Sequence, residues 1–147
     1  MAMNIGGAET HILELTKELS LRGHDVTVAS FGGVYADELQ SFGVRCISLP
    51  LHTKNPAHVM KSYSGLKKLL TAEKFDIVHA HARIPGFIIG LLNDSLTDNG
   101  TKFRFVTTAH LNFSVNPLLR RISRWGERVM AVSDDIADYL VKEYGYP

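Results

Sequence analysis

Apolar and polar residues follow two periods along the chain, one helical and one extended. Over residues 8–22, Ile12, Leu15 and Leu19 recur at helical spacing, which predicts a helix that ends at Gly23. Residues 26–31 form a short apolar run closed by two glycines, which is typical of a strand. The same patterns predict further helices at residues 35–42, 57–73, 84–97, 117–125 and 134–144, and further strands at 44–48, 77–81, 103–108 and 128–132. Ser133 or Asp134 is expected to cap the last helix.

Strands that alternate with helices predict an α/β fold. Each crossover between parallel strands is right-handed, so the expected architecture is a doubly wound, Rossmann-like parallel sheet with helices on both faces. The sequence has no internal repeat and no linker composition, which indicates one domain over residues 1–147.

The start of the chain departs from this architecture. A doubly wound sheet places its first strand just before a glycine turn such as Gly6-Gly7, and residues 1–5 are too few for a strand and a loop. We therefore expect a sheet that lacks its first strand and leaves the neighbouring strands without a partner on that side.

Composition narrows the range of functions. Lys and Arg total 16 against 15 for Asp and Glu, so the net charge of +1 gives no argument for binding nucleic acid. The single cysteine, Cys46, excludes an intrachain disulfide and fits a reducing compartment. The apolar stretch 84–92 is too short to span a membrane, and residues 1–9 do not resemble a signal peptide. A cytoplasmic location is the expectation.

Gly6 and Gly7 precede the first predicted helix, and Glu9 lies in its first turn. Two glycines let the backbone approach a ligand, and the free amides of a helix start suit a phosphate. The alternative is a turn that requires glycine for conformational reasons alone. Gly6, Gly7 and Glu9 are therefore candidates for substrate binding.

His79 and His81 lie at the end of the third predicted strand. Residues two apart in a strand face the same way, so both imidazoles point together at the carboxyl edge, where open α/β sheets bind ligands. A metal site is disfavoured because no third ligand is evident. The alternative is a buried, hydrogen-bonded His79 beside an edge His81. With Arg83, which follows closely, these residues are candidates for substrate binding.

His110 ends the segment Thr107-Thr108-Ala109-His110 at the carboxyl edge of the next strand. A neutral imidazole there can hydrogen-bond to a sugar hydroxyl or a phosphate. A loop histidine that caps a backbone group is the competing interpretation, and the residues alone leave the choice open.

Residues 117–128 combine Arg120, Arg121, Arg124 and Arg128 with an apolar side. A basic amphipathic helix can lie on an anionic membrane at the inner face, which is one interpretation. The favoured one is a helix that packs on the sheet and exposes its charged face to water.

Five pieces of sequence, in order and spacing, resemble the N-terminal domain of a family 4 (group 1) retaining glycosyltransferase. They are Gly6-Gly7-Ala8-Glu9 with His11, LRGHDVTV at 21–28, FDIVHAH at 75–81, TTAH at 107–110 and RVMAVS at 128–133. They extend over nearly the whole chain. The combination is specific to the family but does not identify a substrate.

The resemblance implies one half of a GT-B fold. In this family the N-terminal domain mainly holds the acceptor, and a C-terminal domain, absent from this sequence, holds the nucleotide-sugar donor. By resemblance, His110 contacts the donor sugar near the reacting carbon, His79 and His81 support the cleft edge, and Gly6 and Gly7 approach the donor phosphates or the acceptor. Transfer would retain the anomeric configuration and need no metal or cofactor.

The expected function is thus half of a hexosyltransferase-type enzyme that makes a polysaccharide or glycolipid, and this chain alone is expected to be inactive. Its expected partners are a nucleotide-sugar donor and a carbohydrate or lipid acceptor. Two alternatives remain: a non-catalytic binding half-domain, and a nucleotide-sugar epimerase on the same fold, which would need acid/base carboxylates.

Overall fold

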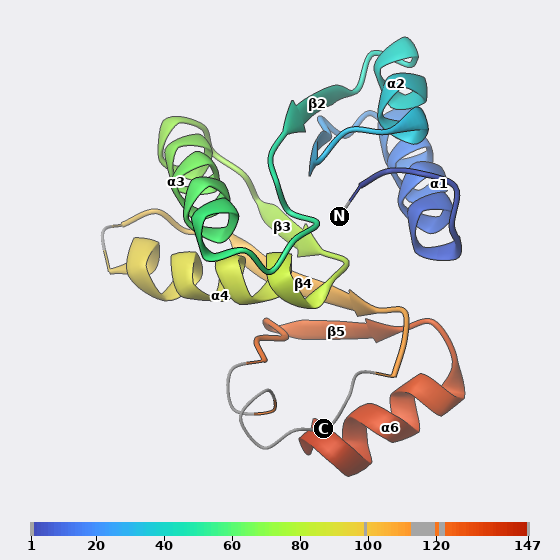
Figure 1. The fold of residues 1–147 in the computed structure, drawn as a ribbon, viewed down its shortest axis with the longest axis vertical. Helices are drawn as coiled ribbons and strands as arrows, with labels where there is room; N and C mark the ends of the chain where they lie inside the picture. The colour runs from blue at the N-terminus through green and yellow to red at the C-terminus, as the bar shows by residue number, and fades with distance from the viewer. Residues whose placement is uncertain (1, 99, 113–119, 121–122, 147) are drawn as a thin grey trace. The chain divides into compact units, whose positions relative to one another are not determined.

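The computed structural model describes residues 2–98, 100–112, 120 and 123–146. Helices and strands alternate along the chain, as the sequence patterns predict (Figure 1). The helices are α1 (Gly7–Leu21), α2 (Val34–Ser41), α3 (Pro56–Ala72), α4 (Arg83–Thr97) and α6 (Asp134–Tyr144). The strands are β1 (Thr27–Ser30), β2 (Arg45–Ser48), β3 (Ile77–Ala80), β4 (Arg104–Ala109) and β5 (Arg128–Ala131).

One predicted helix needs correction. Five of residues 117–125 lie outside the described residues, including Arg121 of the predicted basic surface. Arg120 is helical, whereas residues 123–126 are described and are not helical. The hydroxyl of Thr107 donates a hydrogen bond of 2.7 Å to the carbonyl of Trp125. Because that carbonyl is bound to a strand side chain, residues 123–126 run beside β4 instead of continuing a helix.

The strands form two parallel sheets. β1 pairs with β2, and β3, β4 and β5 pair in that order, with β4 in the centre. The chain divides into two compact units, 1–65 (unit 1) and 66–147 (unit 2). The α/β, Rossmann-like class predicted from the sequence is confirmed.

Unit 1 is built around a small apolar core. Its buried residues are Met3, Ile12, Leu13, Val28, Ala36, Leu39 and Val44. Within the described residues no strand precedes α1. The amide of Met3 instead donates to the carbonyl of Gly32 at 2.7 Å, and its carbonyl accepts from the amide of Tyr35 at 2.9 Å. The first residues are thereby fixed against the end of β1 and the start of α2.

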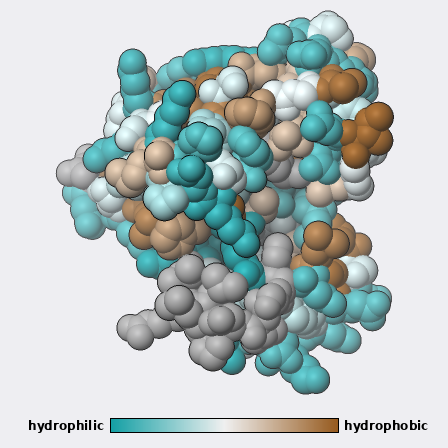
Figure 2. Space-filling view, viewed as in Figure 1, coloured by the Kyte–Doolittle hydropathy of each residue, from teal (hydrophilic) through white to brown (hydrophobic). Residues whose placement is uncertain are grey.

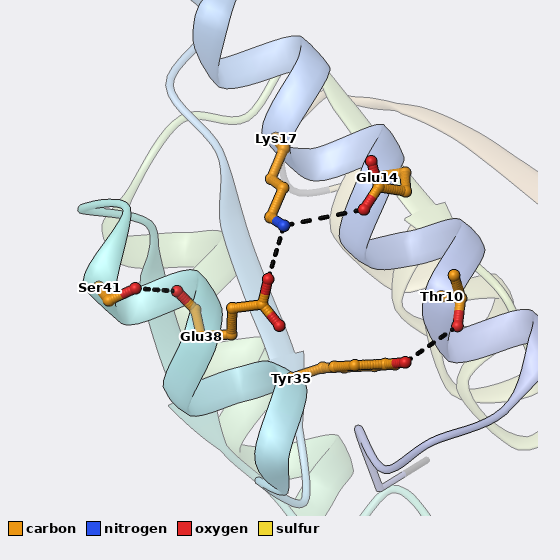
Figure 3. A network of polar contacts seen from close by, with 6 residues as sticks. All are labelled: Thr10, Glu14, Lys17, Tyr35, Glu38 and Ser41. Atoms are coloured by element: carbon orange, nitrogen blue, oxygen red, sulfur yellow. Dashed lines mark hydrogen bonds and ion pairs between the residues drawn. The ribbon is translucent and has the colours of Figure 1, made fainter.

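Polar contacts join α1 to α2 in unit 1 (Figure 3). Lys17 donates to Glu38 at 2.6 Å and lies 3.7 Å from Glu14, so one ammonium group faces two carboxylates. Nearer the start of both helices, the hydroxyls of Thr10 and Tyr35 are 3.2 Å apart. These contacts set the two helices side by side over the core.

In unit 2, α4 and α6 pack against the same face of the sheet. A Cβ on Gly86 of α4 would lie 3.8 Å from Thr107 and 3.9 Å from Ala80, so α4 approaches the sheet closely at this glycine. On α6, Ile136 and Leu140 share a core cluster with Ala109. Thr107 and Ala109 lie two apart on β4 and face the same side. The opposite face of these strands carries the histidines.

The surface shows no large apolar area on the face seen in Figure 2, where hydrophobic residues form small groups between hydrophilic ones. No helix in the described part of the chain has both the length and the apolar character needed to cross a membrane.

Candidate functional site

The candidate site of unit 2 lies at the carboxyl ends of β3 and β4. The parallel register sets His79 beside Val106 and Ala80 beside Thr107. Because side chains alternate along a strand, His79 on β3 and His81 just after it share a face with Thr108 on β4 and His110 just after it. The sheet thus gathers three imidazoles and a hydroxyl at the edge where α/β proteins bind ligands.

Two hydrogen bonds connect these side chains. His79 Nε2 lies 2.8 Å from the hydroxyl oxygen of Thr108, and His81 Nδ1 lies 3.2 Å from His110 Nε2. The ring of His81 is 3.9 Å from that of His79 and 5.5 Å from that of His110, measured between centroids. The three histidines are half-buried, and Thr108 is buried.

This arrangement suits proton exchange and hydroxyl recognition. A neutral imidazole carries one N–H donor and one nitrogen acceptor, so it can bind a sugar hydroxyl in either direction. As metal ligands, His81 and His110 supply two nitrogens from unit 2, fewer than the three protein ligands of catalytic zinc sites. Within unit 2, a hydrogen bond accounts for the spacing of the two nitrogens.

Arg83 begins α4 directly after this edge. Its Nη2 donates a hydrogen bond of 2.9 Å to the hydroxyl of Tyr144 at the end of α6. The Tyr144 ring packs edge-on against Trp125, with centroids 5.2 Å apart. The guanidinium group therefore helps to hold α6 in place, a structural role that the sequence did not indicate; its predicted substrate contact stays a prediction.

A small recess lies at the start of α4 in unit 2. Its lining residues are Ala80, Ala82, Arg83, Thr107, Thr108, Ser123, Arg124 and Trp125. Arg124 is ion-paired with Asp94 at 3.3 Å. The recess has room for about one water molecule, too little for a sugar. The histidine edge is therefore the better candidate for substrate contact.

The glycine turn belongs to unit 1. Gly6 is the N-cap of α1 in an extended conformation, and a Cβ placed on it would lie 2.5 Å from Oε2 of Glu9. The Glu9 carboxylate thus folds back over the start of α1, where the helix dipole favours a negative charge. The close atom is the end of a flexible side chain, so this contact alone does not require glycine at position 6. Phosphate binding at Gly6 and Gly7 stays a prediction.

The sequence located the histidines but missed their partners. Thr108 was part of a noted segment, yet its bond to His79 depends on strand register. The register follows once β3 and β4 are assumed to be neighbours, so the contact between His79 and Thr108 could have been predicted from the sequence. Arg83 and Tyr144 are 61 residues apart, and no sequence pattern links them.

The sequence and the fold are both similar to those of known proteins. The family model described as Glycosyltransferase Family 4 matches residues 5–147. Among solved structures, the chain is similar to a glycosyltransferase from Rickettsia africae ESF-5, with a TM-score of 0.71 and 21% sequence identity. The alignment covers 100% of this chain and 39% of that chain, so the present sequence spans well under half of its structural relative. Among curated proteins, none matches the sequence significantly.

Proposed function

The chain belongs to Glycosyltransferase Family 4, and from this premise we propose that it forms the acceptor-side part of a retaining, GT-B-type enzyme. That enzyme would transfer a hexose from a nucleotide-diphosphate sugar to a carbohydrate or lipid acceptor. The observation that supports the proposal is the group of His79, His81 and His110 at the carboxyl ends of two adjacent parallel strands.

In this proposal His110 contacts the donor sugar near the reacting carbon. A hydrogen bond placed where charge develops lowers the barrier without covalent chemistry. His79 and His81 support the edge, Arg83 lies beside it, and Gly6, Gly7 and Glu9 form a second substrate-binding segment in unit 1. The reaction needs no metal or cofactor, because hydrogen bonds and cations of the protein take up the charge of the leaving diphosphate.

The donor requires residues beyond those of this sequence. The leaving nucleoside diphosphate carries several negative charges, and stabilising them takes a dedicated set of cations and amides. A structural relative that is more than twice as long has room for a further domain. We therefore assign donor binding to such a domain and acceptor binding to the present chain.

The test uses the complete gene product that contains this sequence, assayed with a panel of nucleotide sugars and labelled acceptors. His110→Ala is expected to lower kcat by about 100-fold or more, the range for losing one positioned catalytic hydrogen bond. His24→Ala, at an exposed position outside the site, is the control and should keep wild-type kcat. Wild-type activity in His110→Ala would refute the role assigned to His110. A wild-type protein that is inactive with every donor would refute the proposed transferase function.

A further inference from the structure

The contact between His81 and His110 has the geometry of a direct N–H···N hydrogen bond. The two nitrogens are 3.2 Å apart and the ring centroids 5.5 Å apart. The difference corresponds to about two imidazole radii, so both nitrogens lie close to the line between the rings. A lone pair then faces an N–H head-on, as in a good hydrogen bond.

We propose that His81 is a positioning residue that fixes the ring orientation and the tautomer of His110. A neutral imidazole is protonated on one nitrogen only, so the role of His110 Nε2 in this bond, donor or acceptor, decides which of its nitrogens carries the hydrogen. Any contact that His110 makes with a substrate is then made in the tautomer that His81 sets. This role of His81 in catalysis rests on the proposed function, whereas the hydrogen bond itself does not.

His81 is itself held by the neighbouring side chains. Its ring lies against that of His79, with centroids 3.9 Å apart, and His79 is bonded to the hydroxyl of Thr108 at 2.8 Å. Thr108 is 4% exposed and lies on β4, which is paired on both sides. The side chains of His79 and His81 are therefore supported by the central strand of the three-stranded sheet. This support lowers the entropic cost of holding His110 in one orientation.

The hydrogen bond is tested first, by NMR on the 147-residue chain with 15N-labelled histidine in the presence of EDTA. We expect a coupling across the hydrogen bond between His81 Nδ1 and His110 Nε2, with His110 in a single tautomer. His81→Ala should abolish the coupling and give His110 a mixture of tautomers. His81→Asn should restore a hydrogen bond to His110 Nε2, because the asparagine amide places a polar partner near the former Nδ1.

His58→Ala, on α3, is the matched control and should leave the His110 signals unchanged. The amide spectra of all variants confirm that each remains folded. A wild-type chain without the coupling, or a His110 tautomer that His81→Ala leaves unchanged, overturns the proposal. So does a sample without EDTA in which metal-induced shifts replace the coupling, since an ion would then join the nitrogens.

The catalytic role is tested in the complete gene product. His81→Ala should lower kcat by about tenfold or more with little change in KM, as expected when a partner that orients a histidine is lost. His81→Asn should recover most of kcat. Unchanged kcat in His81→Ala, with an active wild type, overturns the positioning role. An inactive wild type that still shows the coupling refutes the proposed function and leaves the His81–His110 bond standing.

Discussion

Gly126 shows how one residue fixes the approach of two segments. Its φ of +80° lies in the left-handed region, and a Cβ there would collide with the carbonyl of Phe105 on β4. The same carbonyl accepts from the amide of Glu127 at 2.7 Å, and the Gly126 carbonyl accepts from Tyr146 at 2.9 Å. The segment before β5 can lie this close to β4 only because position 126 has no side chain.

Gly126→Ala is therefore expected to destabilise unit 2 through both strain and collision. Gly145→Ala is the matched control, because Gly145 also has a positive φ, +64°, but open space around its Cβ position. The control should lose about 1 to 2 kcal/mol of unfolding free energy, and Gly126→Ala should lose about 1 to 3 kcal/mol more. Urea unfolding followed by Trp125 fluorescence measures both, and equal losses would contradict the collision.

The sequence predicts where the candidate residues lie better than what they touch. His79, His81 and His110 follow from the rule that parallel strands end at one edge, and the structure brings them together there. The choice of Nδ1 on His81 and Nε2 on His110 depends on side-chain rotamers, which no spacing specifies. Likewise, Glu9 over Gly6 is a local packing result that the glycine pattern does not distinguish from a phosphate loop.

At the scale of elements, α1 and α2 in unit 1 are joined by a partly shielded ion pair. The hydrogen bond to Glu38 raises the pKa of Lys17, with further contributions from the charges of Glu38 and Glu14. The Lys17 ammonium also lies 4.8 Å from the centroid of the Phe42 ring. Its side chain is 20% exposed, whereas the pair Arg22–Glu18 is mostly exposed. The coupling energy between Lys17 and Glu38 should therefore be larger than that between Arg22 and Glu18.

A double-mutant cycle of Lys17→Met and Glu38→Gln tests this difference. At pH 9 we expect a coupling energy larger than that of the control cycle Arg22→Met and Glu18→Gln. Because the pKa of Lys17 is raised in the folded state, the charged ammonium stabilises the fold at pH values below its ordinary pKa of 10.5. This stabilisation is lost as the pH rises through the pKa of the folded state. The coupling should thus fade above pH 10.5, while the arginine control keeps its charge. Coupling that persists at pH 12 would show that charge is not its source.

Element positions follow closely from hydrophobic periodicity. The predicted helix 134–144 agrees with α6, and Ser133 accepts a hydrogen bond from the amide of Ile136 as its cap. The described end of the predicted helix 117–125 is not helical, and the Trp125 carbonyl is bound instead to Thr107 of β4, a tertiary contact that overrides a local pattern. Periodicity also identifies strands without stating which ones pair, so it did not foresee a two-stranded and a three-stranded sheet.

At the scale of the whole molecule, each of the two units buries a cluster of apolar residues. Unit 1 buries the cluster that includes Leu39 and Val28, and unit 2 buries one that includes Ala109 and Leu140. No strand ladder joins the sheets among the described residues. The sequence predicts a single domain over 1–147, and a single cooperative transition would be its thermodynamic signature. A division into two compact units predicts two transitions instead.

The chain carries one natural probe in each unit, Cys46 in unit 1 and Trp125 in unit 2. Burial raises the pKa of the Cys46 thiol, and its Sγ lies 3.6 Å from the Ala36 carbonyl, so labelling at pH 7.5 should be slow until unit 1 opens. We expect the urea midpoint for Cys46 labelling to differ from that for Trp125 fluorescence. The mutation Leu39→Ala, in the core of unit 1, should shift the Cys46 midpoint, with a loss of about 2 to 5 kcal/mol, and leave the Trp125 curve in place. Coincident curves that both shift with Leu39→Ala would instead establish one cooperative domain.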